Sequence, residues 1–313
     1  MKAAVIEHYG SPQEFKIKNL PRPEIKTGQI LVENKASSIN PIDTIVRKGK
    51  TLLVTGMTGD ILLGSDFSGI VIESKSDRFQ VGDEVFGLNP AIKGGSYAQQ
   101  IIVDAENAVS KPSNLSFTEA AVLPLVSLTA WQGMVTEGKL KQGNHILITG
   151  CTGGVGLVAV QIAKTFNAEI TGTCSARNAD FARSIGVDHV VIYDQDKIPE
   201  STKFDLIFDA SGHFTIDDMK INLTDEAMFV STKGGADRLK GAVDAAIDLA
   251  FQKRMKIIMM VPNQADLNKI RELAESGKLK AHIAKTFQLE ELPQAHQMME
   301  DGGFTGKIAI EIN

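Results

Sequence analysis

A glycine-rich stretch at residues 150–156 (GCTGGVG) has residue types and spacing that suit a chemical task. It follows an apolar run at residues 145–149 and precedes an amphipathic run at residues 154–166. Glycines permit a tight turn and let a pyrophosphate approach the backbone, while the following helix offers free N–H groups and a positive dipole end to the anion. The stretch therefore predicts a dinucleotide-binding loop, and a glycine turn without a ligand is the alternative.

The loop departs from the GxGxxG pattern at one position. Cys151 stands where the first glycine is expected, and Gly150 comes one position earlier. The same string fits the TGxxxGxG motif of short-chain dehydrogenases, but that motif is expected near the start of a chain, so the Rossmann-type loop is favoured. A thiol at a helix N-terminus is open to oxidation, yet Cys151 fits a small buried thiol better.

Polar residues after the next predicted strand indicate which dinucleotide the loop would hold. An NAD site expects Asp or Glu about 20 residues after the loop, bonded to the ribose 2′-OH. Residues 173–178 (TCSARN) include no acid. Ser175 offers a hydroxyl to a phosphate and Arg177 can pair with it bidentately, so NADP(H) is favoured. An exposed residue at a helix start is the alternative for Arg177, although a cation there opposes the helix dipole.

The segments that must position these residues alternate between strand and helix after residue 116. Ser116 and Glu119 form a capping box that predicts a helix over about 118–135. Strands are then predicted at 145–149, 168–173, 189–193, 204–210, 227–231 and 256–261, and helices at 154–166, 179–185, 239–253 and 266–276. This alternation predicts a parallel sheet with helices on both faces.

The two ends of the chain have a different pattern. Short β-type runs with frequent Gly and Pro in the first 110 residues predict a barrel-like or sandwich unit. Residues 285–289 and 306–312 return to β structure around a short helix near 293–300. The predicted fold class is therefore α/β: a β-rich domain (residues 1–117 and 285–313) into which a doubly wound nucleotide-binding domain (residues 118–284) is inserted.

Composition limits the classes of protein that remain. A chain of 313 residues with 43% hydrophobic and 23% charged residues fits two globular domains and excludes disorder as the main state. The net charge of -5 argues against nucleic-acid and anionic-membrane partners. Two cysteines cannot form a disulfide framework or a four-cysteine zinc site. The N-terminus lacks a signal-peptide pattern and the apolar stretch 120–131 is too short to span a bilayer, so we expect a soluble cytoplasmic protein without a membrane partner.

A series of ordered motifs runs along the whole chain. They are residues 1–10 (MKAAVIEHYG), 40–43 (NPID), 64–69 (GSDFSG), 81–85 (VGDEV), 94–99 (GGSYAQ), 123–125 (LPL), 128–130 (LTA), the glycine loop, 173–178 and 306–310 (GKIAI). Together they resemble the medium-chain dehydrogenase/reductase superfamily, and specifically its zinc-free quinone oxidoreductase branch, which includes the chloroplast-envelope-type enone reductases.

The resemblance implies a GroES-like β domain, a Rossmann domain, and hydride transfer from NADPH to a quinone or an activated alkene. Carried over by position, the residues on the pyrophosphate are Gly153, Gly154, Val155 and Gly156. The residues around the 2′-phosphate are Ser175, Arg177 and Tyr193, and those near the ribose or nicotinamide are Thr129, Ser211, Ser231 and Lys307. A homodimer formed by edge pairing of the Rossmann sheets is also implied.

Zinc divides the wider superfamily. Zinc-dependent relatives place Cys near the position of Asn40 and Gly-His-Glu where this chain has GSD at residues 64–66. The six histidines show no ligand-type spacing, so no metal site is expected. Oxidation of an unactivated alcohol without a Lewis acid is not expected. Reduction of a conjugated acceptor needs only a hydrogen-bond donor for the developing enolate.

Three polar residues are candidates for the donor and the proton source. Asn40 has an amide N–H suited to a carbonyl oxygen, although Asn before Pro41 is also common in turns. Asp43 is a candidate proton relay, and bonding to the backbone is its alternative. Tyr97 is a candidate donor, and an aromatic at the edge of the core is its alternative. Solvent could also supply the final proton.

The leading hypothesis is a zinc-independent, NADPH-dependent reductase of quinones or α,β-unsaturated carbonyls. One alternative is an enzyme similar to the zinc-type alcohol dehydrogenases, against which the missing ligands argue. Another is a non-catalytic NADPH-binding sensor or structural protein. Loop-like segments at residues 51–60 and 88–93, Phe67, and the region after Ser231 are expected to line the substrate pocket.

Overall fold

The computed structural model describes residues 1–50, 59–91, 93–233 and 254–313. The chain divides into two compact units, one of residues 1–125 with 262–313 and the other of residues 126–261. The first unit is thus built from both ends of the sequence and the second from its middle. The predicted helix at 239–253 and most of the predicted pocket loop at 51–60 fall outside the described residues.

The units divide the chain at different residues from the expected domain limits. Residues 118–125 and 262–284 group with the β-rich unit. In α9 (Gln264–Glu275), the side-chain amide of Gln264 donates to the carbonyl oxygens of Ala105 and Ala108, at 2.9 Å each. The helix therefore packs on the β-rich unit, which its sequence periodicity does not reveal.

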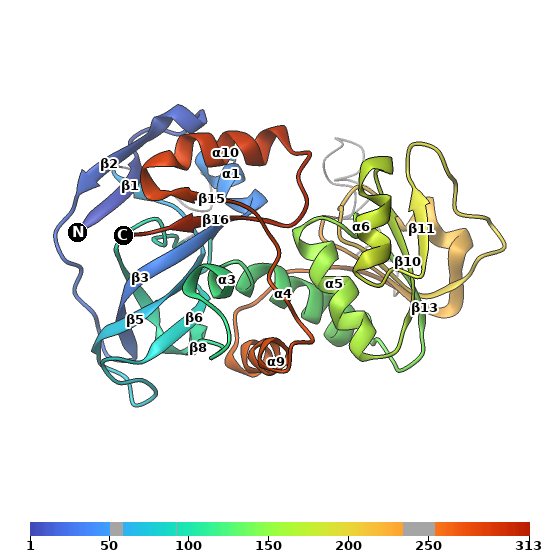
Figure 1. Ribbon diagram of the computed structural model, residues 1–313, viewed down its shortest axis with the longest axis horizontal. Helices are drawn as coiled ribbons and strands as arrows, with labels where there is room; N and C mark the ends of the chain where they lie inside the picture. Colours follow the sequence, from blue (N-terminus) through green and yellow to red (C-terminus); the bar gives the residue numbers. More distant parts are fainter. Residues whose placement is uncertain (51–58, 92, 234–253) are drawn as a thin grey trace. The chain divides into compact units, whose positions relative to one another are not determined.

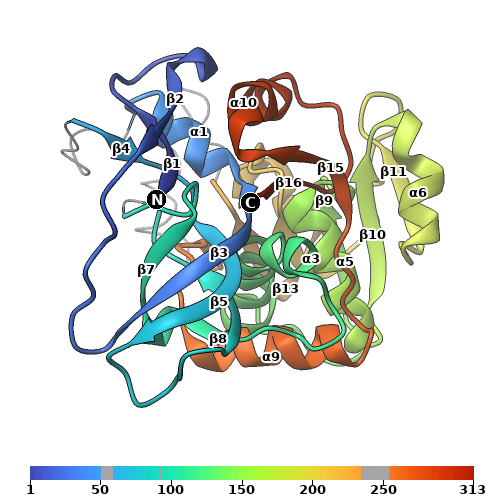
Figure 2. The same ribbon diagram turned by 60° about the vertical axis from the view of Figure 1, so that its left-hand side comes forward.

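The first unit is built on a mainly antiparallel sheet in the order β15-β16-β3-β5-β6-β8 (Figure 1), and β7 also pairs with β3 (Figure 2). Its strands are β3 (Gln29–Ile39), β5 (Asp66–Ser74), β6 (Glu84–Leu88), β7 (Gln100–Asp104), β8 (Ala108–Ser110), β15 (Ile283–Gln288) and β16 (Lys307–Glu311). β16 runs antiparallel to β3 and places Ile308 opposite Ile39. This register brings Lys307 next to Asn40, which directly follows β3.

A smaller sheet and several helices complete this unit. They are β1 (Lys2–Ile6), β2 (Phe15–Asn19), β4 (Ile61–Leu62), α1 (Pro41–Arg47), α10 (Leu292–Asp301), and the 3-10 helices η1 (Pro12–Glu14), η2 (Ala105–Asn107) and η6 (Leu289–Glu291). The sheet has the order β2-β1-β4. α10 lies over β15 and β16 in both ribbon views (Figures 1 and 2). Its buried Leu292 and Ala295 belong to one apolar cluster with Ile308 and Ile310 of β16.

Helix α1 was not predicted, because the first 110 residues were expected to contain only strands and turns. Its first residue is Pro41 and its first turn contains Asp43. Proline at the first position has the dihedral angle that a helix needs, and an acid in the first turn is favoured by the helix dipole. The local sequence therefore starts a helix immediately after Asn40.

The helix predicted over residues 118–135 is interrupted. It is divided into α3 (Phe117–Ala121), α4 (Pro124–Trp131) and the π-helix η3 (Gln132–Glu137). Pro124 has no N–H with which to continue α3, so the helix restarts there. The capping box is confirmed: the backbone N–H of Glu119 donates to Ser116 Oγ at 3.2 Å, and that of Ser116 donates to Glu119 Oε2 at 2.9 Å.

The second unit contains a parallel sheet in the order β11-β10-β9-β12-β13-β14, which confirms the Rossmann-like α/β prediction. Its strands are β9 (His145–Thr149), β10 (Glu169–Cys174), β11 (His189–Ile192), β12 (Phe204–Asp209), β13 (Leu223–Ser231) and β14 (Met255–Ile257), the last shorter than predicted. Its helices are α5 (Gly154–Thr165), α6 (Ala179–Ser184), α7 (Ile216–Met219), η4 (Ala176–Asn178) and η5 (Lys220–Asn222). α5 packs on β9 and β10, and α6 packs on β10 and β11.

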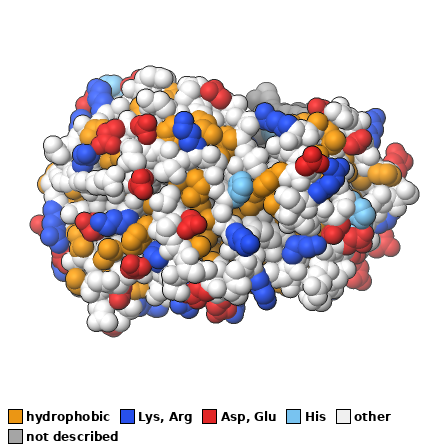
Figure 3. Space-filling view, viewed as in Figure 1, with side chains coloured by type: hydrophobic (Ala, Val, Ile, Leu, Met, Phe, Trp, Pro, Cys, Tyr) orange, Lys and Arg blue, Asp and Glu red, His pale blue; other side chains and the backbone are white. Residues whose placement is uncertain are grey.

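Acidic and basic side chains are interspersed over the face drawn in Figure 3, where neither sign forms a broad patch. Among the helices of the described residues, none has the length and apolar character needed to cross a membrane.

Candidate functional site

The glycine loop lies between β9 and α5, as predicted. Gly153 is the N-cap of α5, and the backbone N–H of Cys151 donates to the carbonyl oxygen of Thr173 at 3.0 Å. A Cβ added to Gly156 would lie 2.2 Å from the carbonyl oxygen of Gly150. The close approach of helix and loop therefore requires glycine at position 156.

Gly153 differs from Gly156 because none of the described residues forbids a side chain there. The nearest atom to an added Cβ is Gly150 O at 3.4 Å, an ordinary contact. The first turn of α5 also carries N–H groups that no preceding helical carbonyl accepts. Free N–H groups beside a glycine at a helix N-terminus suit the pyrophosphate of a dinucleotide. The loop therefore fits the coenzyme predicted from the sequence.

The predicted 2′-phosphate residues follow the ends of two adjacent strands. β10 and β11 are parallel, and the backbone N–H of Tyr193 donates to Cys174 O at 3.2 Å. Ser175 follows Cys174, and both Arg177 and Tyr193 are exposed. The amide of Asn178 donates to Thr152 Oγ1 at 3.2 Å, which ties this segment to the glycine loop. Ser175, Arg177 and Tyr193 thus lie at the carboxyl edge of the sheet, where nucleotide ligands bind in this fold.

The cysteines fit the buried-thiol interpretation. Cys151 and Cys174 are both free thiols and both buried. Burial raises the pKa of Cys151 to about 12. A thiol with so high a pKa is almost entirely protonated near neutral pH, so Cys151 is a poor nucleophile.

Asp209 is a buried acid that the sequence analysis did not single out. It ends β12, and its carboxylate accepts hydrogen bonds from the hydroxyls of Thr149, Ser211 and Ser231 at 2.6 to 2.7 Å. Two of these partners, Ser211 and Ser231, are residues predicted to lie near the ribose or nicotinamide. An acid near the carboxyl end of the strand predicted over residues 204–210 is the sequence signal that could have marked it. Thr129, the remaining candidate of the second unit, is buried in α4.

The three candidate catalytic residues lie together inside the first unit. Asn40 and Tyr97 are 0% exposed and Asp43 is 2% exposed. The backbone N–H of Asn40 donates to Asp43 Oδ2 at 2.8 Å, and the hydroxyl of Tyr97 donates to the same oxygen at 3.3 Å. The hydroxyl of Ser65 lies 3.4 Å from Asp43 Oδ1. Asp43 therefore bonds to the backbone, as its alternative interpretation held, and also to a phenol.

Lys307 and Asp66 hold the side chain of Asn40. Lys307 Nζ donates to the side-chain oxygen of Asn40 and, at 2.8 Å, to the carbonyl oxygen of Ile39. Asn40 Nδ2 donates to Asp66 Oδ2 at 2.8 Å. An amide nitrogen has two hydrogens, and Asp66 accepts one of them. Lys307 was expected near the coenzyme, and in the structure its ammonium group contacts a candidate catalytic residue, Asn40.

Two acids and one ammonium share this buried network. Burial raises the pKa of Asp43 to about 7, and the charge of Asp66 adds to the effect while Lys307 opposes it. Burial also raises the pKa of Asp66, against the opposing effects of Lys307, Asn40 and Ser38. The pKa of Tyr97 is raised well above its ordinary value by burial and by Asp43. Near neutral pH, Tyr97 keeps its proton and Asp43 is close to half protonated.

A second buried network borders Tyr97. The ring of His296 meets the Tyr97 ring edge-on, with centroids 5.8 Å apart, and tilts over Phe15 at 4.7 Å. Arg47, fully buried, donates from Nε to His296 Nδ1 at 3.4 Å and pairs with Glu300. Burial and the charge of Arg47 lower the pKa of His296 to about 3. This histidine is therefore neutral at physiological pH and packs against the Tyr97 ring.

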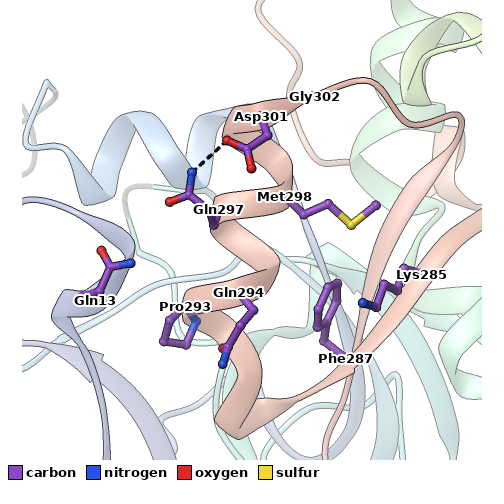
Figure 4. Close-up of a pocket in the computed structure, with 9 residues that line it drawn as sticks. All are labelled: Gln13, Lys285, Phe287, Pro293, Gln294, Gln297, Met298, Asp301 and Gly302. Atoms are coloured by element: carbon purple, nitrogen blue, oxygen red, sulfur yellow. Dashed lines mark hydrogen bonds between the residues drawn. The ribbon is translucent and has the colours of Figure 1, made fainter.

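A groove of about 640 Å³ lies elsewhere in the first unit, beside α10 and β15 (Figure 4). Its lining residues are Gln13, Lys285, Phe287, Pro293, Gln294, Gln297, Met298, Asp301 and Gly302. The Lys285 ammonium lies 4.5 Å from the centre of the Phe287 ring, and Gln297 donates to Asp301 at 2.8 Å. None of the candidate site residues lines it.

Comparison with known proteins assigns the chain to a class and then to a family. A GroES-like β unit together with a Rossmann-like unit defines the medium-chain dehydrogenases and reductases. Residues 26–113 match the alcohol dehydrogenase GroES-like domain family, and residues 185–310 match the zinc-binding dehydrogenase family. Among the described residues, no group of three or more His, Cys, Asp or Glu side chains is placed to hold a metal ion.

Individual relatives give the same assignment. The chain is 30% identical to mouse mitochondrial NAD(P)H oxidoreductase RTN4IP1, over 100% of this chain and 89% of that protein. It is 31% identical to 2-methylene-furan-3-one reductase of Solanum lycopersicum, over 99% of this chain and 79% of that protein. The structure of the quinone oxidoreductase from Coxiella burnetii superimposes with a TM-score of 0.87 at 30% identity, covering 100% and 99% of the two chains. The chain belongs to the quinone oxidoreductase branch of the medium-chain dehydrogenase/reductase superfamily.

Proposed function

We propose that this protein is a zinc-independent reductase that uses NADPH to reduce quinones or α,β-unsaturated carbonyl compounds. The observation that carries the proposal is the side chain of Asn40, which Lys307 and Asp66 hold from both ends of its amide. This hydrogen-bond donor stands near the position where zinc-dependent relatives have a cysteine ligand. A donor rather than a Lewis acid suits an acceptor that is already conjugated.

The coenzyme assignment is supported by the second unit. NADPH, when bound, supplies a hydride to the acceptor. The first turn of α5 and the backbone of Gly153 would hold its pyrophosphate. Ser175, Arg177 and Tyr193 would surround the 2′-phosphate, for which an exposed guanidinium is well suited. Thr129, Ser211, Ser231 and Lys307 stay predictions as coenzyme contacts.

Asn40 would bind the carbonyl oxygen of the acceptor. Its amide oxygen accepts from Lys307 and one amide hydrogen goes to Asp66, so the amide plane is fixed and the second hydrogen has a set direction. A fixed donor stabilises the charge that develops on the oxygen without first having to reorient. Lys307 and Asp66 are therefore positioning residues for Asn40.

Asp43 and Tyr97 would hold the proton that the reduced product needs. A carboxyl group with a pKa of about 7 can release and regain a proton near neutral pH. The Tyr97 hydroxyl donates to Asp43, so the two groups form one hydrogen-bonded path inside the first unit. Solvent is the alternative source of this proton.

The relatives support the choice of acceptors. One matched structure is that of a quinone oxidoreductase, and one relative is a reductase named for 2-methylene-furan-3-one, whose methylene group is conjugated with a ketone. A homodimer and a cytoplasmic location stay predictions of the sequence analysis.

The test is a panel of acceptors with purified protein, with NADPH consumption as the readout. A simple quinone and a short enone should both be reduced, and Asn40→Ala should lose most of this activity while it still binds NADPH. A saturated alcohol with NADP⁺ is the control for alcohol dehydrogenase activity, and metal analysis should find zinc well below one ion per chain. One zinc ion per chain together with alcohol oxidation would support the alternative of a zinc-type alcohol dehydrogenase. NADPH binding without reduction of any acceptor would support the alternative of a non-catalytic NADPH-binding protein.

A further inference from the structure

The carboxylate of Asp209 connects the ends of neighbouring strands on the edge of the sheet that carries the glycine loop. We propose that Asp209 is the positioning residue of the coenzyme site, because it fixes the carboxyl ends of β9, β12 and β13 relative to one another. This inference rests on the proposed function in one respect: it takes the second unit to be the NADPH-binding unit.

The hydrogen bonds of Asp209 come from three different strand ends. Oδ1 accepts from Thr149 Oγ1 at 2.6 Å, Ser211 Oγ at 2.7 Å and the backbone N–H of Gly212 at 3.0 Å. Oδ2 accepts from Ser231 Oγ at 2.7 Å and the backbone N–H of Phe214 at 3.2 Å. Thr149 ends β9, Ser231 ends β13, and the other three donors belong to the segment that follows β12.

Burial makes this arrangement rigid. Asp209, Thr149 and Ser231 are each 0% exposed, so water does not compete for these donors. An ionised carboxylate offers about four lone-pair sites and no proton, which matches a set of partners that can all donate. Hydrogen bonds to a charged acceptor are stronger than neutral ones, and a buried donor left without an acceptor is costly. The donors therefore stay in place only while position 209 carries a carboxylate.

The strand ends that Asp209 connects lead directly into the coenzyme site. Thr149 is the residue before Gly150, the first residue of the glycine loop. A Cβ added to Gly150 would lie 3.3 Å from Ser211 Cβ, so the glycine loop and the segment after β12 are in contact. Ligands of open parallel sheets bind at the carboxyl ends of the strands. Asp209 thus sets the distance between the loop for the pyrophosphate and the segment that carries Ser211.

The same strand provides a matched control at its other end. Asp205, near the start of β12, accepts from the backbone N–H of His145 at 2.9 Å and from the Asn144 amide at 3.2 Å. It is therefore a structural carboxylate in the same strand, at the edge of the sheet opposite the glycine loop. Asp205→Asn and Asp209→Asn remove one negative charge each and keep the shape of the side chain.

The experiment measures the dissociation constant of NADPH by calorimetry for the wild-type chain and both variants, together with their melting temperatures. Asn at position 209 places an NH₂ group against donors whichever way the amide turns, so Asp209→Asn should weaken NADPH binding about tenfold to a hundredfold. Asp205→Asn should change the dissociation constant of NADPH by less than about twofold, even if its melting temperature falls as much as that of Asp209→Asn. The KM for NADPH should rise in Asp209→Asn while kcat at saturating NADPH changes little.

Each other outcome identifies what has failed. If the wild-type chain does not bind NADPH, the proposed function fails. If the wild-type chain binds NADPH and Asp209→Asn binds it equally well, or if both variants lose affinity in proportion to their loss of stability, the positioning role is overturned. Should Asp209→Asn not fold, Thr149→Val removes one hydroxyl donor at nearly constant shape. It should weaken NADPH binding several-fold in a folded protein, and unchanged affinity would overturn the inference.

Discussion

Lys307 donates a hydrogen bond to the side-chain oxygen of Asn40, although 267 positions separate them in the sequence. The antiparallel register of β16 and β3 produces this contact, since it places Ile308 opposite Ile39. The same ammonium lies 3.9 Å from Asp66 Oδ2, and its charge also acts on Asp43. One lysine thus orients the proposed substrate donor and balances the charge of the buried acids.

Replacing Lys307 with Met should destabilise the protein by about 3–5 kcal/mol, because it leaves a buried carboxylate without its cation. Denaturant titration of wild type and variant at neutral pH measures this difference. Lys285→Met in the neighbouring strand β15 is the matched control. The Lys285 side chain is exposed, so this substitution should lower stability by less than about 0.5 kcal/mol. The double variant Lys307→Met with Asp66→Asn should recover part of the loss, and an unchanged loss would contradict the pairing.

Asp43→Asn should remove a pH dependence of catalysis that the wild-type protein shows near pH 7. The raised pKa of Asp43, about 7, means that its protonated form is lost as the pH rises through this range. If that form supplies the proton, kcat for an enone should fall above about pH 7 in the wild-type protein. Asp43→Asn should be slower and should lose this limb of the profile. A variant that keeps the wild-type profile would assign the proton to solvent.

Stability provides an independent check on Asp43. Its folded pKa lies above its unfolded value of 3.8, so between these two values the folded state binds more protons and stability falls as the pH rises. The free energy of unfolding of Asp43→Asn, relative to wild type, should therefore increase by about 2–3 kcal/mol between pH 5 and pH 8. Asp104→Asn is the control, because Lys93 and Gln29 hold the pKa of Asp104 below its ordinary value and outside this window.

Local patterns were enough to predict the α/β architecture and the glycine loop. Residues 145–166 contain a strand, a turn and a helix in direct succession, so all the information lies within one short segment. The same holds for the capping box at Ser116 and Glu119, which the structure confirms. The interruption at Pro124 was missed because the apolar pattern continues across it, although proline has no N–H for a continuous helix.

The composition of the polar clusters could not be predicted in the same way. Asn40, Asp66 and Lys307 meet only because β3, β5 and β16 pair, and pairing over such separations depends on the register of the whole sheet. Asp209 connects strands that are distant in the sequence for the same reason. The sequence shows where each acid stands along the chain, but it does not identify which hydroxyl or ammonium group faces it in the fold.

Arg177→Ala should remove the preference for NADPH over NADH. The guanidinium is exposed after β10, in a segment (residues 173–178) that contains no acid for a ribose hydroxyl, so its loss should weaken NADPH binding by about 1–3 kcal/mol and leave NADH binding unchanged. Calorimetric titration with both coenzymes measures the ratio of the NADH and NADPH dissociation constants. Arg183→Ala is the control, since Arg183 is an exposed arginine of the same region that already pairs with Asp180 at 2.8 Å. Equal ratios in wild type and Arg177→Ala would refute the assignment.

Gly153→Val and Gly156→Ala should separate ligand binding from folding. Among the residues that the structure describes, an added Cβ at position 153 meets only an ordinary contact at 3.4 Å, so the Gly153→Val chain should fold but fail to bind NADPH. At position 156, a Cβ would lie 2.2 Å from a backbone oxygen, so Gly156→Ala should lower stability by about 1–3 kcal/mol. Melting curves and NADPH titration distinguish the two effects. NADPH binding retained by Gly153→Val would exclude this part of the loop from the site.

His296 should limit the stability of the protein in acid. Its folded pKa of about 3 lies below the ordinary value of 6.5, so the unfolded state binds more protons between these two values. The stability that neutral His296 contributes is complete above pH 6.5 and is lost as the pH falls, by about 2 kcal/mol at pH 5. The wild-type chain should lose unfolding free energy between pH 7.5 and pH 5, and His296→Gln should lose less by the amount that His296 contributes. His8→Gln, a substitution at an exposed position, is the control and should show the wild-type loss. Equal pH dependence in His296→Gln and the wild-type chain would mean that this ring is protonated in the folded state, next to the buried guanidinium of Arg47.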